Sequence, residues 1–271
     1  MKETTLLSIR DFSEFTGIKQ STLRYYDEIG LLPPVARGEN NYRFYAPFQI
    51  ITINFINVLT ELGVPLSTIK EMSHDRTPEN VIDLLNKQEA MLDIKLVELY
   101  TSYSIIHTFR QNILKGLSIK SDEIKIVELN EANIVLGPEN DFQDKTTFYE
   151  PFIHFCNSAN EYRINLRYPI GGYHYDMEHF LETPGKPDRF FSQDPVGNVK
   201  REAGEYLVAY KYGYYGQFND LPDRIASYAA AHGIGFTGPV YIIYLLDEIS
   251  IVEREEYLAR LSVKIKKEGR A

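Results

Sequence analysis

The chain has 271 residues, 44% of them hydrophobic and 25% charged, with a formal net charge of −9. This length and composition fit two globular domains and a connector. The mean hydropathy of −0.29 and the lack of an apolar run of about 18 residues exclude a membrane span. The first residues lack the basic start and apolar stretch of a signal peptide, so we expect a cytoplasmic protein.

The single cysteine, Cys156, excludes a disulfide framework within the chain. It also argues against a thiolate metal site or an iron–sulfur cluster, both of which need several cysteines. The six histidines show no pair at metal-ligand spacing with acidic support. We therefore expect no metal and no cofactor, and we interpret Cys156 as a small buried hydrophobe on a helix and not as a reactive thiol.

Residues 1–76 contain short helical stretches broken by Gly and Pro. Ser8 and Asp11 have the spacing of a capping box, which predicts the start of a short helix. Its inward side chains are expected to be Ile9, Phe12 and Phe15. A second helix is predicted over residues 20–29 and ends at Gly30. Two short helices joined by a tight turn are typical of a helix-turn-helix.

The second predicted helix has two different faces. Leu23, Tyr26 and Ile29 form an apolar stripe that can anchor it to the domain. The opposite face carries hydrogen-bonding and cationic groups, namely Gln20, Ser21, Thr22, Arg24 and Tyr25. A recognition helix needs this arrangement, because one face must pack while the other offers donors to bases and phosphates. The plainer alternative is a solvated helix face.

A turn-rich stretch over residues 37–41 precedes Tyr42-Arg43-Phe44-Tyr45. This pattern predicts a β-hairpin, and therefore a wing, with Arg43 exposed between aromatic residues. Two further helices are predicted, one after Pro47 and one, bearing Lys70, after the break at residues 63–66. The acidic net charge opposes nucleic-acid binding, but residues 1–76 hold eight Lys/Arg against nine Asp/Glu and are nearly neutral.

These motifs resemble, in order and spacing, the DNA-binding domain of the MerR family. The segments that carry the resemblance are residues 22–27, 30–31, 42–45 and 62–66. The resemblance implies a winged helix-turn-helix in which Arg24 and Tyr25 anchor DNA, Arg43 lies on the wing and Lys70 contacts the DNA backbone. The predicted DNA-binding residues are Gln20, Ser21, Thr22, Arg24, Tyr25, Tyr42, Arg43 and Lys70.

Residues 78–117 form one long helical repeat. One row of side chains recurs every seven residues, at Leu85, Leu92, Leu99, Ile106 and Ile113. A second row interleaves with it, at Ile82, Glu89, Leu96, Tyr103, Arg110 and Leu117. Such a seam predicts a coiled coil, although packing of a long helix within its own chain is the alternative. In an antiparallel pair Glu89 and Arg110 can meet, and the family resemblance implies such a pairing in a homodimer.

From about Ser121 the pattern shifts toward alternation, which is typical of strands. Helices are predicted near residues 146–158 and 218–231. Residues 121–271 are therefore expected to form an α+β domain of two similar β-α-β-β halves. The whole chain is predicted to be an α+β multidomain protein: a winged helix-turn-helix, a long coiled-coil linker helix and this C-terminal α+β domain.

Tyrosine is dense in the C-terminal part, and its hydroxyl makes it a poor choice for a sealed core. We interpret this density as an aromatic ligand pocket, with plain packing as the alternative. The layout resembles the gyrase-inhibitor-like effector domain that follows the MerR module in BmrR-type multidrug-sensing activators. Where such a sensor has a buried glutamate facing cationic ligands, this sequence offers Ile242. Either the ligand is less cationic, or Glu255 or Glu256 meets its charge nearer the rim; the plainer alternative for these two glutamates is a solvated loop. The predicted ligand-binding residues are Tyr149, Phe152, Tyr168, Tyr173, Tyr241, Ile242, Glu255, Glu256 and Tyr257.

The resemblance implies a ligand-responsive transcription activator that distorts promoter DNA when a lipophilic aromatic ligand binds. Its expected partners are double-stranded promoter DNA, RNA polymerase, a second copy of the chain and that ligand, with no membrane. Three alternatives remain: a sensor of one metabolite, an architectural DNA binder without a ligand, and a small hydrolase using Glu256 and Tyr257. No nucleophile with a base and an orienting group is visible, so we do not expect an enzyme.

Overall fold

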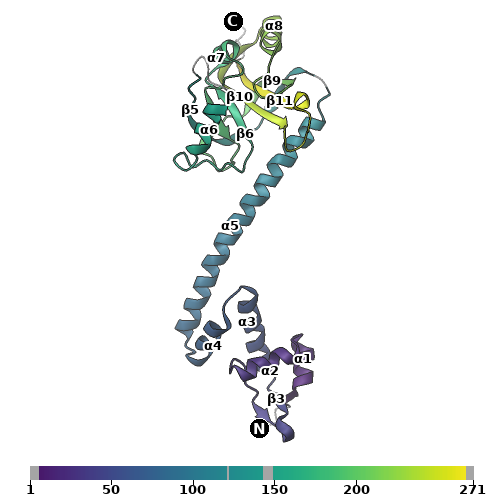
Figure 1. The fold of residues 1–271 in the computed structure, drawn as a ribbon, viewed down its shortest axis with the longest axis vertical. Coiled ribbons are helices and arrows are strands. Elements are labelled where there is room, and N and C mark those ends of the chain that lie inside the picture. Colours follow the sequence, from purple (N-terminus) through teal and green to yellow (C-terminus); the bar gives the residue numbers. More distant parts are fainter. Residues whose placement is uncertain (1–5, 121, 143–148, 267–271) are drawn as a thin grey trace. The chain divides into compact units, whose positions relative to one another are not determined.

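The structure, a computed structural model, describes residues 6–120, 122–142 and 149–266. Contacts group the chain into two compact units, Met1–Glu98 and Leu99–Ala271, which divide within the helix α5 (Pro78–Leu117). Figure 1 labels many of the elements of both units. None of the helices in the described ranges is long and apolar enough to cross a membrane.

The first unit is a helical domain with a small antiparallel sheet. Its helices are α1 (Ile9–Thr16), α2 (Gln20–Glu28), α3 (Gln49–Glu61) and α4 (Leu66–His74). The sheet has the order β1-β3-β2, from β1 (Leu7–Ser8), β3 (Arg43–Tyr45) and β2 (Ala36–Arg37), with the 3-10 turn η1 (Glu39–Asn41) between β2 and β3. The predicted helix-turn-helix and hairpin are both present, and β1 adds a strand that the sequence did not suggest.

The capping box at the start of α1 is confirmed. The Asp11 amide donates to Ser8 Oγ at 3.2 Å, and the Ser8 amide donates to Asp11 Oδ2 at 3.3 Å. Ile9 and Phe12 are buried, but the prediction for Phe15 is wrong, because its side chain is 70% exposed. Successive steps of three residues rotate around a helix by about 60° each, so Phe15 has turned away from the face that Ile9 defines.

The long helix α5 matches the predicted range and runs without interruption for 40 residues. Gly116 is its one buried residue among those described in the single chain. The side chains of the predicted seam stay open to solvent, with Leu99 70%, Ile106 68%, Tyr103 65% and Leu96 64% exposed. These apolar side chains have no cover within the described chain.

In the described residues, the second unit contains one eight-stranded antiparallel sheet with three helices besides the end of α5. The strand order is β4-β9-β11-β10-β6-β7-β5-β8. The strands are β4 (Ile124–Leu129), β5 (Ala132–Glu139), β6 (Ile170–His174), β7 (Arg189–Ser192), β8 (Val199–Arg201), β9 (Gly204–Tyr212), β10 (Gly235–Leu246) and β11 (Leu258–Lys266). The helices are α6 (Tyr149–Asn157), α7 (Met177–Glu182) and α8 (Leu221–His232).

This sheet is built from two matching halves, β4-β5-α6-β6-β7 and β8-β9-α8-β10-β11. If each strand is replaced by its counterpart in the other half, the same strand order results, read from the opposite edge of the sheet. The counterparts β6 and β10 therefore pair at the centre. The predicted α+β class is confirmed, but each half has one more strand than the predicted β-α-β-β unit. The first strand of each half pairs with the other half, β4 on β9 and β8 on β5. Residues 146–148 of the predicted first helix lie outside the described residues.

Alternating side chains of the central strands divide between two faces of the sheet. On one face, α7 and α8 cover a core that includes Leu261 and Ile242. On the other face, Ile243 and Tyr241 join Ile119, which follows the end of α5. This division decides which residues of β10 can share one cavity.

Candidate functional sites

The helix α2 presents a polar surface on an apolar base. Leu23 and Tyr26 are buried in the core of the first unit. Arg24 and Ser21 are exposed, Tyr25 is 48% exposed, and Gln20 and Thr22 are half-buried. Arg24 Nη2 donates weakly to Gln20 Oε1 at 3.4 Å, which leaves most of its guanidinium facing outward. The helix therefore displays the predicted donors on its solvent side.

Arg43 does not lie free on the wing as expected. Its Nε donates to Asp27 Oδ2 at 2.6 Å, and its side chain is only 18% exposed. Arg37, its cross-strand partner, donates from Nη2 to both oxygens of the same carboxylate at 2.8 and 2.7 Å. The Asp27 side chain is 4% exposed, so these ion pairs hold the hairpin against α2. The expectation of an exposed Arg43 is corrected, because a carboxylate 16 residues earlier engages it.

The remaining predicted DNA-binding residues, Tyr42 and Lys70, lie on two different elements. Tyr42 is 48% exposed beside the hairpin and packs edge-to-face on Phe44, with ring centroids 5.5 Å apart. Lys70 is half-buried on α4, and its ε-carbon passes close to Gly30 at the end of α2. Gly30 has φ +73° there, a left-handed conformation that favours glycine. The Lys70 side chain therefore lies next to the end of α2.

A cavity of about 500 Å³ opens on the α6 and α8 side of the second unit's sheet. Its floor is formed by β6 and β10, with Gly172 opposite Ile242 in the strand register. The loops that carry Gly185 and Gly216 close one side, where their backbones approach so tightly that a side chain at Gly185 would meet the Gly216 carbonyl at 2.6 Å. A volume of this size is typical of a small-molecule site.

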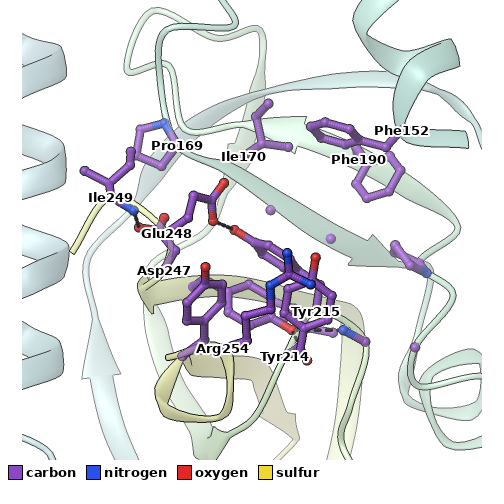
Figure 2. A pocket seen from close by; sticks show the side chains of 18 of the residues that line it. Phe152, Pro169, Ile170, Phe190, Tyr214, Tyr215, Asp247, Glu248, Ile249 and Arg254 are labelled. Atoms are coloured by element: carbon purple, nitrogen blue, oxygen red, sulfur yellow. Dashed lines mark hydrogen bonds between the residues drawn. The ribbon is translucent and has the colours of Figure 1, made fainter. Parts of the chain in front are cut away.

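Aromatic rings form most of the wall. Figure 2 shows Phe152 and Phe190 together at one end of the cavity, where their ring centroids are 5.5 Å apart. Tyr215 packs edge-to-face on Tyr244 at 4.4 Å and on Tyr257 at 5.7 Å. Stacked and edge-on aromatic faces of this kind attract both apolar rings and cations.

Two carboxylates and one arginine lie at the other end. Figure 2 shows Asp247 and Glu248 there, with Tyr215 donating its hydroxyl proton to Glu248. Burial raises the pKa of the Asp247 carboxyl, while the Ile249 amide, which donates to Oδ1 at 3.1 Å, opposes that shift. Arg254 lies over the Tyr214 ring, 5.0 Å from its centroid. The lining groups thus carry one more negative than positive charge when both acids are ionised.

Hydroxyl groups of the cavity are tied to one another. Tyr149 and Tyr214 share a hydrogen bond between their hydroxyl oxygens at 2.8 Å. The Tyr244 hydroxyl accepts from the Gly216 amide at 3.0 Å, and burial raises the pKa of that hydroxyl. Burial, followed by the hydrogen bond to Glu248, also raises the pKa of Tyr215. Tyr215 and Tyr244 are therefore neutral at physiological pH and offer fixed hydrogen-bonding groups to the cavity.

Five of the nine predicted ligand-binding residues line this cavity: Tyr149, Phe152, Tyr168, Ile242 and Tyr257. Tyr173 and Tyr241 lie on the opposite face of the sheet, paired edge-to-face at 5.6 Å. Neighbours in a strand point to opposite faces, so Tyr241 and Ile242 do not share one pocket. Glu255 and Glu256 are exposed in the short 3-10 turn η2 (Arg254–Glu256) and do not line the cavity either.

Several lining residues were not among the predicted ligand-binding residues, above all Asp247, Glu248, Tyr214 and Tyr215. The segment Gly213-Tyr214-Tyr215-Gly216 lies between β9 and α8, and both of its glycines have positive φ. Two glycines around two tyrosines, placed between a strand and a helix, are a signal for a loop that presents aromatic rings. Asp247 and Glu248 follow the end of β10, where a turn brings them to the cavity rim.

Metal binding finds no support in the described part of the chain, where no group of three or more His, Cys, Asp or Glu side chains could hold an ion. Cys156 is half-buried on α6 beside Phe152, and burial raises the pKa of its thiol. A raised thiol pKa disfavours the reactive thiolate.

A winged helix-turn-helix in one unit and an aromatic cavity in the other define the class of ligand-responsive transcription regulators. The family model described as MerR family regulatory protein matches residues 8–45. The multidrug-efflux transporter 2 regulator of Bacillus subtilis is 28% identical, over 94% of this chain and 95% of its own length. An uncharacterised HTH-type transcriptional regulator of Bacillus subtilis is 33% identical, over 45% of this chain and 83% of its own length.

The chain belongs to the MerR family of transcription regulators. Among solved structures, the N-terminal part of the Bacillus subtilis multidrug transporter activator is 28% identical to this chain. The match covers 37% of this chain and 94% of the solved one. Its TM-score is 0.32, so the family assignment rests on the sequence relatives alone.

Proposed function

We propose that this chain is a transcription activator that senses lipophilic aromatic cations in the cavity between its two C-terminal halves. The observation that carries the proposal is a cavity of about 500 Å³ with aromatic walls and two carboxylates at one end. A cation held there meets ring faces and the Asp247 carboxylate together. The similarity of the chain to a regulator of a multidrug-efflux transporter supports a ligand of this kind.

The negative charge of this cavity lies at one end and not in the floor. Ile242, at the centre of the floor, is 4% exposed and supplies only shape and apolar surface. Negative charge comes from Asp247 and Glu248 at the end of β10. We therefore expect the cationic group to bind toward that end and the apolar rings of the ligand to contact Phe152 and Phe190.

Binding of tetraphenylphosphonium, measured by titration calorimetry, tests this proposal. The neutral triphenylphosphine oxide keeps three of the aromatic rings and lacks the charge, so it serves as the matched ligand. We expect saturable binding of the cation and binding of the neutral compound at least about 10-fold weaker, since a charge–charge contact near a protein surface is worth more than about 1.4 kcal/mol. Equal affinities would remove the carboxylates from the recognition.

The pH dependence of cation binding follows from Asp247. Its pKa is raised by burial above the usual value near 4, so lowering the pH protonates it earlier than an ordinary carboxyl. The affinity for tetraphenylphosphonium is expected to fall as the pH is lowered from 7 toward 5. In Asp247→Asn the affinity should be at least about 10-fold lower at pH 7 and nearly independent of pH.

Glu248→Gln is the control for that experiment, because Glu248 is exposed and its carboxylate already accepts from Tyr215. We expect a loss of about threefold or less for this variant, because an exposed charge is screened by solvent. A larger loss of affinity in Glu248→Gln than in Asp247→Asn would mean that Glu248, and not Asp247, recognises the cation.

We propose that DNA is contacted through α2, with Arg24 as its main cation, in a homodimer paired through α5. Arg24→Gln is expected to weaken operator binding about 10- to 100-fold and to reduce the slope of affinity against salt concentration. The unfolding free energy should stay within about 0.5 kcal/mol, because the side chain is exposed. Fluorescence anisotropy at several salt concentrations and urea unfolding measure the two effects.

Arg43→Gln is the paired variant, and its main expected effect is on the stability of the first unit and not on operator affinity. It removes one arginine from the buried Asp27 carboxylate, so the first unit should lose about 1–3 kcal/mol of unfolding free energy. Unchanged stability in this variant, together with a full loss of DNA binding, would return Arg43 to the role of a direct DNA contact.

A further inference from the structure

A second cavity, of about 380 Å³, lies on the opposite face of the same sheet. Tyr241 and Ile243 face it, while their strand neighbours Ile242 and Tyr244 face the cavity described above. Strands β5, β7, β8, β10 and β11 all contribute to its lining. The two cavities are therefore separated by the thickness of one β-sheet.

Arg260 stands in the middle of β11, between Tyr210 of β9 and Ile243 of β10 in the strand register. Among the described residues, its Nε is buried without a hydrogen-bond acceptor, and no carboxylate lies within ion-pair distance of its guanidinium. Burial lowers the pKa of Arg260 to about 10, with the nearby Arg201 adding to the shift. The guanidinium still carries its charge at neutral pH.

Two more buried donors face the same space. Arg201 uses Nη2 to donate to the Asn130 carbonyl at 2.9 Å, and its guanidinium carbon lies 5.2 Å from the Tyr206 ring centroid. Those contacts fix the group, while its buried Nη1 has no acceptor in the described structure. The side-chain amide nitrogen of Gln193 is buried without an acceptor in the same way. Three side chains thus present hydrogen-bond donors to one cavity.

The acids around the cavity are already engaged elsewhere. Glu131 lines it, but its side chain is 65% exposed and its Oε2 lies 3.1 Å from Lys200 Nζ. Glu202, whose charge acts on the Tyr241 hydroxyl, accepts from Lys264. Water can satisfy the hydrogen bonds of buried guanidinium groups but cannot neutralise their charge, and an uncompensated buried charge is strongly unfavourable.

We propose that this second cavity binds a small organic carboxylate, separate from the ligand of the first cavity. Arg260 and Arg201 hold the two carboxylate oxygens, since guanidinium groups match that planar anion. Phe191, Tyr241 and Ile243 line the space that receives the apolar body of the acid. The volume is larger than an inorganic anion needs and suits an acid with one ring. The protein therefore has one cavity with excess carboxylates and one with excess arginines, on opposite faces of one sheet.

Titration of the full-length protein with benzoate tests this proposal, with benzamide as the neutral compound of the same shape and inorganic phosphate as the anion without a ring. We expect saturable binding of benzoate, binding of benzamide at least 10-fold weaker, and no saturable binding of phosphate in the same range. Binding of phosphate in place of benzoate would overturn the carboxylate class, and binding of neither would overturn the site.

Arg260→Met removes the central charge and keeps the apolar stem, and Arg167→Met, at an exposed arginine of the same unit, is the matched control. Arg260→Met is expected to weaken benzoate at least 10-fold while tetraphenylphosphonium binds within twofold of its original affinity. Arg167→Met should change neither.

The urea midpoint of the ligand-free protein gives a second readout. If Arg260 is held for an anion, Arg260→Met should unfold at an equal or higher urea concentration, because a cation whose buried Nε has no acceptor is gone. A lower midpoint together with unchanged benzoate affinity would assign Arg260 a purely structural role. The comparison of benzoate with benzamide on the unaltered protein decides the proposal even if the variant does not fold.

Discussion

Replacing Leu99 and Ile106 with lysine is expected to convert the proposed dimer into monomers and to lower operator affinity at least about 100-fold, since a bivalent protein loses its second contact. These side chains are 70% and 68% exposed in the single chain. They belong to a row that recurs every seven residues along a 40-residue helix. Light scattering measures the mass, and fluorescence anisotropy measures the affinity for a two-half-site operator.

The size of this effect comes from apolar burial. Covering a leucine or isoleucine side chain is worth about 1.5–3 kcal/mol, and each substitution acts in both copies of a symmetric pair. Lysine also places like charges in the seam. In an antiparallel pair Glu89 and Arg110 can meet across the same seam, so that orientation gives the polar positions a role.

A matched pair of lysines on the outer side of the helix controls for charge and helix propensity. Ile94 and Thr101 are also seven residues apart and lie off both seam rows. Ile94→Lys with Thr101→Lys is expected to leave the protein dimeric and its operator affinity within about threefold of the original. If both double variants stay dimeric, the long helix does not provide the dimer interface.

Gly171→Ala is expected to destabilise the second unit by about 3 kcal/mol or more. Gly171 lies on the central strand β6, where a Cβ atom would come within 2.5 Å of the Ile242 carbonyl oxygen and of the Phe191 ring. The carbonyl belongs to the neighbouring strand and cannot move without breaking the sheet register. Urea unfolding followed by circular dichroism measures the loss, and the chain has no tryptophan to interfere with tyrosine signals.

Gly235→Ala gives the comparison within the same sheet. A Cβ atom there would be 3.7 Å from the Lys266 carbonyl oxygen, an ordinary contact. Its unfolding free energy should change by about 0.5 kcal/mol or less. Equal stabilities of the two variants would show that the β6–β10 contact tolerates a side chain and does not fix the cavity floor.

Much of the first unit could be predicted because its signals are local. The Ser8 capping box and the glycine after α2 each lie within a few residues of the helix that they bound. The Asp27–Arg43 ion pair could not be predicted in this way, since it joins a helix to a strand across a turn. The sequence predicts Arg43 as an exposed DNA contact, whereas in the structure its ion pair with Asp27 holds the hairpin against α2.

The cavity in the second unit was predicted only in part, for a related reason. The family resemblance pointed to Tyr149 and the density of aromatic residues pointed to Phe152, and both lie on α6 and line the cavity. Alternation along β10 decides that Ile242 faces the cavity and Tyr241 does not, but the sequence alone does not say which face is the cavity. The carboxylates at its end come from the turn after β10 and not from η2, a choice that depends on how the loops fold back.

Transcription in vitro tests whether the cavity controls the promoter: it uses a promoter that the purified protein protects from nuclease, with RNA polymerase and with or without tetraphenylphosphonium. We predict that the cation raises transcript output severalfold at constant promoter occupancy, and that Asp247→Asn abolishes the response while keeping DNA binding. Output that stays unchanged while calorimetry shows the cation bound would contradict the account, because the cavity would then bind a ligand without controlling the promoter.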